Sequence, residues 1–418
     1  MNQTNKAPYD TIIVGGGLAG LSAALELQKS GKNILLLEAS DRVGGRLRSD
    51  LHQGFILDHG FQVMLTAYSE CQRLLDYSAL KLKTFDPGSY LWTGSKLEVV
   101  ADPLRLPSQL LKTLASSAGT LSDKLKIGTL KRKVAKASDS ELFQTPEQST
   151  RDALLQRGFS EAIIDRFLRP FFTGIFLEDQ LASSSRMFDF VFKCFGQGHA
   201  ALPEQGMADI PQQLAAKLPP SAIQLKTKVQ SLTAKQVTTE HGEVLKARSV
   251  ILATDMSNAA QLSAFVKDRS WNGTRCYYFS APRSPLARPM IALNASGTGL
   301  IQNLCVPSDV SKNYAPTGQS LLCISTAPTP EADSERIQQE LTNWFGPTAN
   351  DYQFLRSYYI PHSLPRQLPG DLPFESFTPK NEEGIWICGD HTHSSSIHGA
   401  LRSGRKTAEA LIAWPQQL

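Results

Sequence analysis

Residues 9–46, which read YDTIIVGGGLAGLSAALELQKSGKNILLLEASDRVGGR, decide the fold of this chain. The run 9–14 is short and apolar, which predicts a buried strand. A glycine-rich string, 15–20, follows at once, and apolar residues then recur at helical spacing up to Gly31, a suitable helix C-cap. A second apolar run, 34–37, predicts another strand and ends in Glu38. The order is therefore strand, glycine-rich turn, helix and strand.

Each of three glycines in the turn has a mechanical task. Gly15 allows the tight turn from strand to helix, Gly17 lets the backbone approach a pyrophosphate, and Gly20 allows the helix to pack closely on the strand. The helix N-terminus offers free N–H groups and a positive dipole end to the phosphates. Glu38 follows about 18 residues after Gly20, close to where a carboxylate accepts hydrogen bonds from a ribose. The segment therefore predicts a dinucleotide site.

The six residues 41–46, DRVGGR, indicate which dinucleotide is bound. They resemble the Arg-x-Gly-Gly-Arg segment of the flavoprotein family that holds monoamine oxidases, protoporphyrinogen oxidase and phytoene-type desaturases, where it closes over the FAD diphosphate. Paired glycines permit close backbone approach, and Arg42 and Arg46 can bind phosphate oxygens in a forked geometry. The candidate FAD residues of this part of the chain are Gly15, Gly17, Leu18, Ala19, Gly20, Glu38, Ala39, Arg42, Gly44, Gly45 and Arg46.

A second motif stands at the other end of the chain. Residues 384–390, GIWICGD, predict a strand that runs into Gly-Asp, and residues 394–400, SSSIHGA, precede a predicted helix. Gly-Asp followed by Gly-Ala resembles the C-terminal motif of the same family. Asp390 can accept a hydrogen bond from a ribityl hydroxyl or lie beside the diphosphate. A helix that begins near Ile397 can direct N–H groups at the flavin N1/O2 edge. The candidates here are Gly389, Asp390, Ile397, His398 and Ala400.

Two inner segments complete the site that the resemblance implies. Residues 54–63 alternate in polarity and then meet a glycine, and in the family this stretch runs along the isoalloxazine or ribityl part of FAD. Gly60, Phe61 and Gln62 are therefore candidates. The predicted strand near 223–229 ends at Val229, a position whose backbone grips the adenine in relatives.

Composition excludes several classes of protein. A length of 418 residues exceeds one ordinary core and predicts two domains, and a net charge of +4 does not suggest a nucleic-acid partner. The six cysteines are scattered without a CxxC pair, which predicts neither a zinc site nor a disulfide framework and favours a reducing compartment, the cytoplasm. Residues 1–8 are polar and no run of about 18 apolar residues occurs, so we expect neither a signal peptide nor a spanning helix.

Four histidines lie near the predicted cofactor. For His59, and for His391, His393 and His398 close to the C-terminal motif, we expect structural hydrogen bonding. A role in proton transfer is the alternative for the last three. They have no matching carboxylates at ligand spacing, so no metal site is predicted.

The predicted fold class is α/β, with a discontinuous Rossmann-like FAD-binding domain of the GR2 flavoprotein type and a mixed α+β substrate domain. We expect the FAD-binding domain over 1–80, 200–262 and 375–418, and the substrate or cap domain over 81–199 and 263–374. Strand-like segments between 275 and 361 predict a β-rich layer in the second domain.

The middle of the chain carries two features that bear on the substrate. Residues 105–136 hold eight basic residues and a single acid, Asp123, on helical faces rich in leucine. Such a helix can contact an anionic membrane as a peripheral protein, and an ordinary cap-domain helix with a solvated basic face is the alternative. Phenylalanines crowd residues 167–195, where they form either core or an apolar substrate tunnel.

The resemblance implies removal of a hydride from an organic substrate to give C=C or C=N. No second GxGxxG marks an NAD(P)H site, so electrons leave to oxygen or a quinone. Covalent-flavin relatives attach FAD through a cysteine near the C-terminal motif, whereas residues 394–396 are serines here, which predicts noncovalent FAD.

The substrate class follows from a missing lysine. Amine oxidases usually carry a lysine near flavin N5, and residues 275–304 contain none. We therefore favour a desaturase or oxidase of an apolar small molecule that is isoprenoid-, carotenoid- or porphyrin-like. A flavin amine oxidase that makes imine and hydrogen peroxide is the alternative, and a non-catalytic flavin-binding protein is the second. The sequence assigns no catalytic residue.

Overall fold

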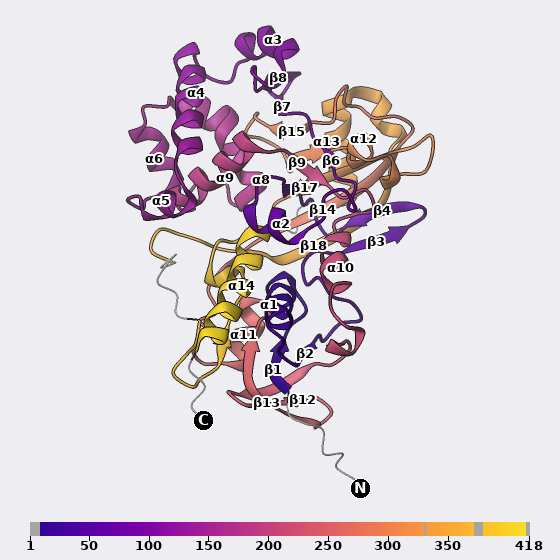
Figure 1. Ribbon diagram of the computed structural model, residues 1–418. Helices are drawn as coiled ribbons and strands as arrows, with labels where there is room; N and C mark the ends of the chain where they lie inside the picture. Colours follow the sequence, from indigo (N-terminus) through magenta and orange to yellow (C-terminus); the bar gives the residue numbers. More distant parts are fainter. Residues whose placement is uncertain (1–8, 330–331, 372–378, 415–418) are drawn as a thin grey trace.

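The computed structural model describes residues 9–329, 332–371 and 379–414. The sequence also predicts a helix over 331–345, and its first residue lies outside the described residues. The polar residues 1–8 and the predicted domain boundary at 375 lie outside them as well. Figure 1 shows one sheet and its helices in the lower half of the view, a helical lobe at the upper left and a second sheet at the upper right. Among the described helices, none is both long enough and apolar enough to cross a membrane.

The first sheet draws its strands from both ends and the middle of the chain. Its order is β10-β2-β1-β13-β12-β11, with β19 paired to β13. The pairs β10–β2, β2–β1, β1–β13 and β13–β19 are parallel, and β11–β12 and β12–β13 are antiparallel. The strands are β1 (Tyr9–Val14), β2 (Ile34–Leu37), β10 (Ile223–Gln224), β11 (Val229–Thr233), β12 (Gln236–Thr239), β13 (Val244–Leu252) and β19 (Trp386–Ile387). The strands predicted at 9–14 and 34–37 therefore form with those bounds, and β1 lies between β2 and β13.

Two helices from opposite ends of the chain pack against each other beside this sheet: α1 (Leu18–Lys29) and α14 (Ile397–Ala413). A Cβ on Gly404 would overlap the carbonyl oxygen of Ala19, so only glycine allows this approach. The hydroxyl of Ser22 donates to the carbonyl oxygen of Leu401 at 2.7 Å. The contact fixes the start of α14 next to the glycine-rich turn.

The second sheet has the order β18-β14-β17-β16-β15-β7-β8. Its members are β7 (Gly88–Trp92), β8 (Leu97–Ala101), β14 (Trp271–Ala281), β15 (Ile291–Asn294), β16 (Ile301–Cys305), β17 (Ser320–Thr326) and β18 (Gln353–Pro365). Two small sheets are separate from both large ones. The first pairs β3 (Ser49–His52) with β4 (Phe55–Asp58), and the second holds β9 (Ala200–Leu202) between β5 (Met64–Leu65) and β6 (Lys83–Thr84). The β-rich layer predicted between 275 and 361 is most of this second sheet.

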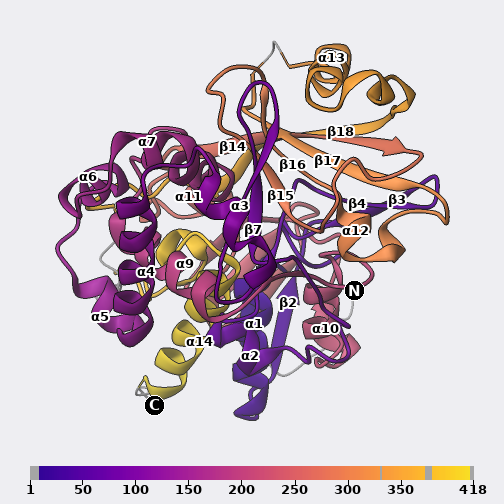
Figure 2. The ribbon, with the colours of Figure 1, turned by 90° about the horizontal axis from the view of Figure 1, so that it is seen from above.

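A helical lobe covers residues 107–197 and lies to one side of the second sheet, on the left of Figure 2. It contains α3 (Leu110–Ala115), α4 (Leu121–Lys136), α5 (Asp139–Gln144), α6 (Thr150–Gln156), α7 (Glu161–Ile163), a π-helical turn (Ile164–Leu168), α8 (Arg169–Phe176) and α9 (Ser185–Gln197). Reciprocal capping boxes start α4, through Thr120 and Asp123, and α5, through Ser138 and Glu141.

The remaining described helices lie between strands. They are α2 (Ser69–Leu74), α10 (Asp209–Ala215), α11 (Met256–Leu262), α12 (Pro307–Val310) and α13 (Ser334–Phe345), with 3₁₀ turns at Pro107–Gln109, Pro220–Ala222, Lys312–Tyr314, Gly346–Asp351 and Asp390–Thr392. The largest buried apolar cluster joins α1 and α14 to the Phe-rich helices α8 and α9. The core is thus shared between the first sheet and the helical lobe.

Candidate active site

A cavity of about 1710 Å³ runs from the glycine-rich turn to the helical lobe. Ligand pockets in proteins commonly measure about 300–1,000 Å³, so this one has room for a dinucleotide together with a second molecule. Its lining includes the predicted residues Gly15, Gly17, Leu18, Ala19, Glu38, Ala39, Gly44, Gly45, Arg46, Gly60, Phe61, Gln62, Val229, Gly389, Asp390, Ile397 and Ala400. Gly20, Arg42 and His398 are the predicted residues that do not line it.

The three glycines of the turn differ in their surroundings as the sequence predicts. Gly15 has a φ of +111°, and a Cβ there would lie 2.8 Å from the carbonyl oxygen of Ala253. A Cβ on Gly20 would overlap the carbonyl oxygen of Gly15, so Gly20 serves packing and not ligand contact. A Cβ on Gly17 would meet no atom within 4 Å, because Gly17 faces the cavity. The open space beside Gly17 fits a pyrophosphate at the start of α1.

Glu38 holds the glycine-rich turn from the end of β2. Its Oε2 accepts a hydrogen bond from the Gly16 N–H at 2.8 Å. Its Oε1 accepts from the N–H and the hydroxyl of Ser40, at 2.8 and 2.7 Å. A carboxylate has about four acceptor sites, so Glu38 retains capacity for a ribose hydroxyl while it lines the cavity.

The two arginines of the DRVGGR segment are bound to protein groups. The Arg42 guanidinium donates to the Ser49 carbonyl oxygen at 3.2 Å and to Asp50 Oδ1 at 3.1 Å, and it does not line the cavity. Arg46 lines the cavity and donates to Asp390 Oδ1 at 2.6 Å. Burial opposes its charge, yet the Asp390 carboxylate raises the pKa of Arg46 above its ordinary value. Arg46 therefore fits a phosphate site, and Arg42 supports the turn from outside.

The C-terminal motif forms the opposite wall. The N–H of Gly389 donates to the Ser403 hydroxyl at 3.0 Å, and the Ser396 hydroxyl caps α14 by accepting from the N–H of Gly399 at 3.0 Å. Ser396, Ile397 and Ala400 line the cavity, so the N-terminal end of α14 meets the ligand space. A helix N-terminus stabilises negative charge, which suits the reduced, anionic form of a flavin ring.

The histidines next to this motif are buried. Burial lowers the pKa of His391 to about 4, of His393 to about 2 and of His398 to about 4. The hydrogen bonding expected for all three is wrong for His391 and His398, because in the described part of the chain neither ring nitrogen of either residue has a partner. His398 packs instead between the rings of Tyr68 and Phe190, at centroid distances of 5.6 and 5.1 Å.

His393 and His59 follow the expectation. Nδ1 of His393 accepts from the Ser394 N–H at 2.8 Å, and Nε2 of His59 lies 2.9 Å from Asp50 Oδ2. Among the described residues, no group of histidine, cysteine and acidic side chains could hold a metal ion.

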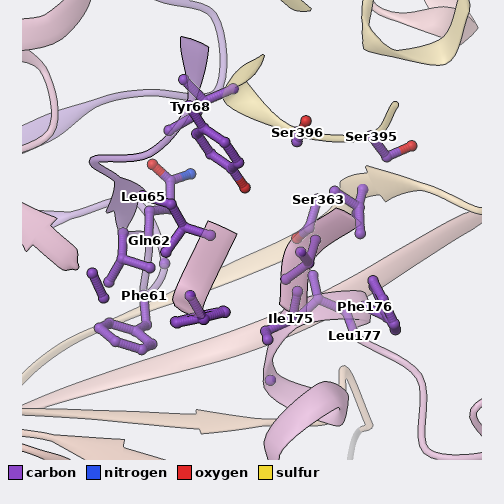
Figure 3. A pocket seen from close by; sticks show the side chains of 18 of the residues that line it. Phe61, Gln62, Leu65, Tyr68, Ile175, Phe176, Leu177, Ser363, Ser395 and Ser396 are labelled. Atoms are coloured by element: carbon purple, nitrogen blue, oxygen red, sulfur yellow. The ribbon is translucent and has the colours of Figure 1, made fainter. Parts of the chain in front are cut away.

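Figure 3 shows the middle of the cavity, with Phe61, Gln62, Leu65 and Tyr68 on one side and Ile175, Phe176 and Leu177 on the other. The Gln62 amide donates from Nε2 to the Arg46 carbonyl oxygen at 3.1 Å, while its buried Oε1 has no partner among the described residues. That unpaired oxygen fits a ring N–H donor of a ligand. Tyr68 carried no signal in the sequence, because neither spacing nor motif marks it. Ile175 and Leu177 lie in the Phe-rich stretch 167–195, which the sequence marks as core or tunnel without singling them out.

The wall beyond this point is apolar. Phe167, Phe171, Phe176, Phe192 and Phe195 line the cavity, whereas Phe172, Phe188 and Phe190 are core residues. The Phe-rich stretch therefore supplies both tunnel wall and core. The lysines on the lining are Lys124, Lys131 and Lys228, and none of these comes from the strands β14–β17.

Comparison with known proteins identifies the family. The profile of flavin containing amine oxidoreductases matches residues 18–412. The chain belongs to this family. The cofactor of this family is FAD, and the cradle at Gly17, the Gln62 oxygen and the start of α14 all fit it. No cysteine lines the described cavity, in agreement with noncovalent FAD.

The similar curated sequences include protoporphyrinogen oxidase 2 of Arabidopsis thaliana, 33% identical over 168 residues, and the mitochondrial protoporphyrinogen oxidase of Nicotiana tabacum, 28% identical over 169 residues. Each alignment covers 39% of this chain and 31% of the relative, so the match spans about a third of these relatives. Among solved structures, putrescine oxidase bound to putrescine has a TM-score of 0.74 at 16% identity, with 98% of this chain and 100% of that one covered. Cyclohexylamine oxidase from Brevibacterium oxydans has a TM-score of 0.70 at 18% identity, with 97% and 99% covered. These structural likenesses show a shared fold.

Proposed function

We propose that this flavoenzyme removes a hydride from an apolar organic substrate of isoprenoid, carotenoid or porphyrin type, as a desaturase or oxidase. The observation that carries the proposal is the wall of the cavity beyond Gln62, which is built from phenylalanine, isoleucine and leucine side chains. Such a wall binds a substrate by excluding water and offers few groups to a charged one.

Bound FAD supplies the hydride-accepting chemistry. The residues of the chain hold and orient the two ligands: Gly17 and the start of α1 face the diphosphate, Glu38 faces the ribose, and the start of α14 faces the ring. Ile175 and Leu177 face Phe61 and Gln62 across the cavity (Figure 3), and we place the substrate between them. Oxygen or a quinone is the proposed electron acceptor.

The ion pairs of the cavity argue against a cationic amine substrate. The carboxylates that line the substrate half are Asp86 and Asp102. Asp86 pairs with Arg288 at 2.5 Å, and Asp102 pairs with Lys131. An ammonium group would have to compete with those cations. A flavin amine oxidase remains the second candidate because the chain shares the fold of putrescine oxidase.

Two further parts of the proposal concern organisation and location. We assign the FAD-binding domain to 1–80, 200–262 and 375–418 and the substrate domain to 81–199 and 263–374. Every described strand of the first sheet lies in the former ranges, and every described strand of the second sheet lies in the latter. We place the protein in a reducing compartment, the cytoplasm, because all six cysteines are free thiols.

Anaerobic reduction of the bound FAD tests the function. The purified holoprotein is mixed in detergent with a porphyrinogen, with a phytoene-type polyene, and with simple amines such as benzylamine and putrescine, and the flavin absorbance is followed. We expect bleaching by one of the apolar substrates and none by the amines. Rapid bleaching and peroxide formation with a simple amine would establish the amine oxidase instead. Bleaching by dithionite alone would indicate a non-catalytic flavin-binding protein.

A further inference from the structure

Six exposed leucines gather at the helical lobe, and we call them the leucine patch. They lie in the loop before α3, on α3, and in the first two turns of α4. They are Leu104 (82% exposed), Leu110 (40%), Leu111 (79%), Leu114 (45%), Leu121 (63%) and Leu125 (67%). Single exposed apolar residues are ordinary, whereas a contiguous group of this kind marks an interaction site.

The leucine patch lies along the part of the cavity lining that comes from the helical lobe and the loop before it. Every member except Leu111 is part of the cavity lining. The glycine-rich turn and the start of α14 line another part of the cavity, and Figure 1 shows α3 and α4 at the end of the molecule opposite to the first sheet. A molecule that enters the cavity past the patch therefore meets leucine side chains first.

Positive charge accompanies the leucine patch. Exposed basic side chains on α3 and α4 have no ion pair in the described part of the chain; they are Lys112, Arg132, Lys133 and Lys136. The other lysines nearby are engaged, since Lys124 donates to the Leu114 carbonyl oxygen at 2.9 Å and Lys131 pairs with Asp102.

No acid offsets these cations within the basic stretch. Asp123 is the sole acid between residues 105 and 136, and it is 1% exposed. It accepts hydrogen bonds from the hydroxyls of Thr120 and Ser160, both at 2.7 Å. Three acids from neighbouring segments pack against this stretch, and each is paired with a lysine: Glu98 with Lys96, Asp102 with Lys131 and Asp139 with Lys193. The unpaired exposed charges on α3 and α4 are therefore positive.

We propose that the leucine patch docks on an anionic lipid bilayer, with the leucines in the interface and the four cations on lipid headgroups, so that the substrate cavity opens into the lipid phase. Apolar burial and headgroup attraction are the two contributions that hold interfacial helices. Charge complementarity favours this partner over a second copy of the chain, because a two-fold interface would set the same cations against one another. The substrate route rests on the proposed function, whereas the docking does not.

Vesicle binding by the FAD-loaded protein tests the docking without turnover. We expect the protein to sediment with vesicles of equal parts phosphatidylcholine and phosphatidylserine, and far less with pure phosphatidylcholine. Replacing the four cations by glutamine weakens binding to the anionic vesicles by more than about a hundredfold, since each basic residue near such a surface contributes about fivefold. The matched control replaces four exposed lysines of the first-sheet region by glutamine and binds like wild type; these are Lys29, Lys235, Lys246 and Lys267.

The leucines are tested in parallel by Leu104→Gln, Leu111→Gln and Leu125→Gln together, against Leu51→Gln, Leu155→Gln and Leu225→Gln as the matched set of exposed leucines. We expect the triple variant of the leucine patch to lose sedimentation with the anionic vesicles and the control triple variant to keep it. FAD content and melting temperature stay unchanged in both variants. Equal binding by all variants would overturn the proposal. So would a wild-type dimer that only the first set converts to monomers, because the patch would then join two copies. The proposed function is tested by FAD reduction in detergent, whereas the docking is tested by sedimentation with vesicles. Failure of the apolar substrates to reduce FAD would therefore contradict the proposed function and leave the docking proposal standing.

Discussion

Arg46 and Asp390 form an ion pair in the wall of the FAD site, with 2.6 Å between Arg46 Nη2 and Asp390 Oδ1. They lie 344 positions apart in the sequence. The Asp390 side chain is 5% exposed and that of Arg46 is 31% exposed. The pair joins the N-terminal segment to the C-terminal motif, so the site exists only when both ends of the chain are folded together.

Arg46→Met leaves the buried Asp390 carboxylate without its partner. We expect the free energy of unfolding of the apoprotein to fall by about 3 kcal/mol, the usual cost of breaking a buried pair, and FAD to be lost during gel filtration. Urea denaturation measures the first effect. Arg248→Met is the control, because Arg248 is 63% exposed and pairs with Asp10 at 3.4 Å, and it costs less than about 1 kcal/mol. Equal losses in the two variants would contradict a structural role for the Arg46 pair.

The substitutions Gly17→Ala and Gly20→Ala test two different roles: contact with the ligand at Gly17 and packing of α1 at Gly20. A methyl group on Gly17 projects into the cavity, so FAD affinity drops at least about tenfold while apoprotein stability changes by less than about 1 kcal/mol. A methyl group on Gly20 meets the Gly15 carbonyl oxygen, so the apoprotein loses about 2 kcal/mol or more. FAD titration and urea denaturation distinguish the two. Unchanged FAD affinity in Gly17→Ala would mean that the diphosphate lies elsewhere.

The sequence predicts the first βαβ unit and the C-terminal motif because their signals are local. Gly15 turns the chain with a positive φ and Gly20 packs on the carbonyl oxygen of Gly15, so both demands arise within the turn itself. Gly389-Asp390 likewise follows a short strand directly. The same local reasoning predicts a phosphate role for Arg42, but a long side chain is directed by its tertiary neighbours. Here the nearest carboxylate is Asp50 on β3, which no spacing rule connects to Arg42.

The division of the Phe-rich stretch could not be predicted for a different reason. Helix α9 has one wide apolar face, opposite Arg186 and Lys193. Phe188 and Phe190 of that face lie in the core, and Phe192 and Phe195 lie on the cavity wall. Periodicity identifies the apolar face of a helix, but it does not say which part of that face meets protein and which part meets a cavity. Likewise, His398 packs against Tyr68, which directly precedes α2, and against Phe190 from α9. This contact depends on how the helical lobe packs on α14.

Ile175→Trp tests where the substrate binds. Ile175 is partly buried and lies across the cavity from Phe61 and Gln62 (Figure 3), so a larger ring there fills the space assigned to the substrate. We expect FAD content and the flavin spectrum to stay close to wild type, while the rate of anaerobic FAD reduction by the apolar substrate falls at least about a hundredfold, as for a misplaced substrate. Dithionite reduction of the same sample shows that the flavin remains competent. Unchanged reduction by substrate would move the substrate site away from Ile175.

His398 is fully buried among aromatic rings, and its ring nitrogens have no partner among the described residues. Burial lowers its pKa from an ordinary 6.5 to about 4, so the unfolded chain binds the proton more tightly than the folded protein does. The contribution of neutral His398 to the free energy of unfolding is therefore fully present above pH 6.5. It is lost as the pH falls towards 4, because the unfolded chain then takes up a proton that the folded protein does not.

His398→Phe keeps a ring of similar size and removes the titration. Each pKa unit is worth about 1.4 kcal/mol, so between pH 7 and pH 4 the wild-type apoprotein should lose about 3 kcal/mol more stability than the variant. Urea denaturation at several pH values measures the difference. His241→Phe is the control, because the His241 side chain is 80% exposed, and its pH dependence should follow wild type. Parallel pH profiles for wild type and His398→Phe would show that His398 is protonated as readily in the folded protein as in the unfolded chain, which its enclosure by Tyr68 and Phe190 does not allow.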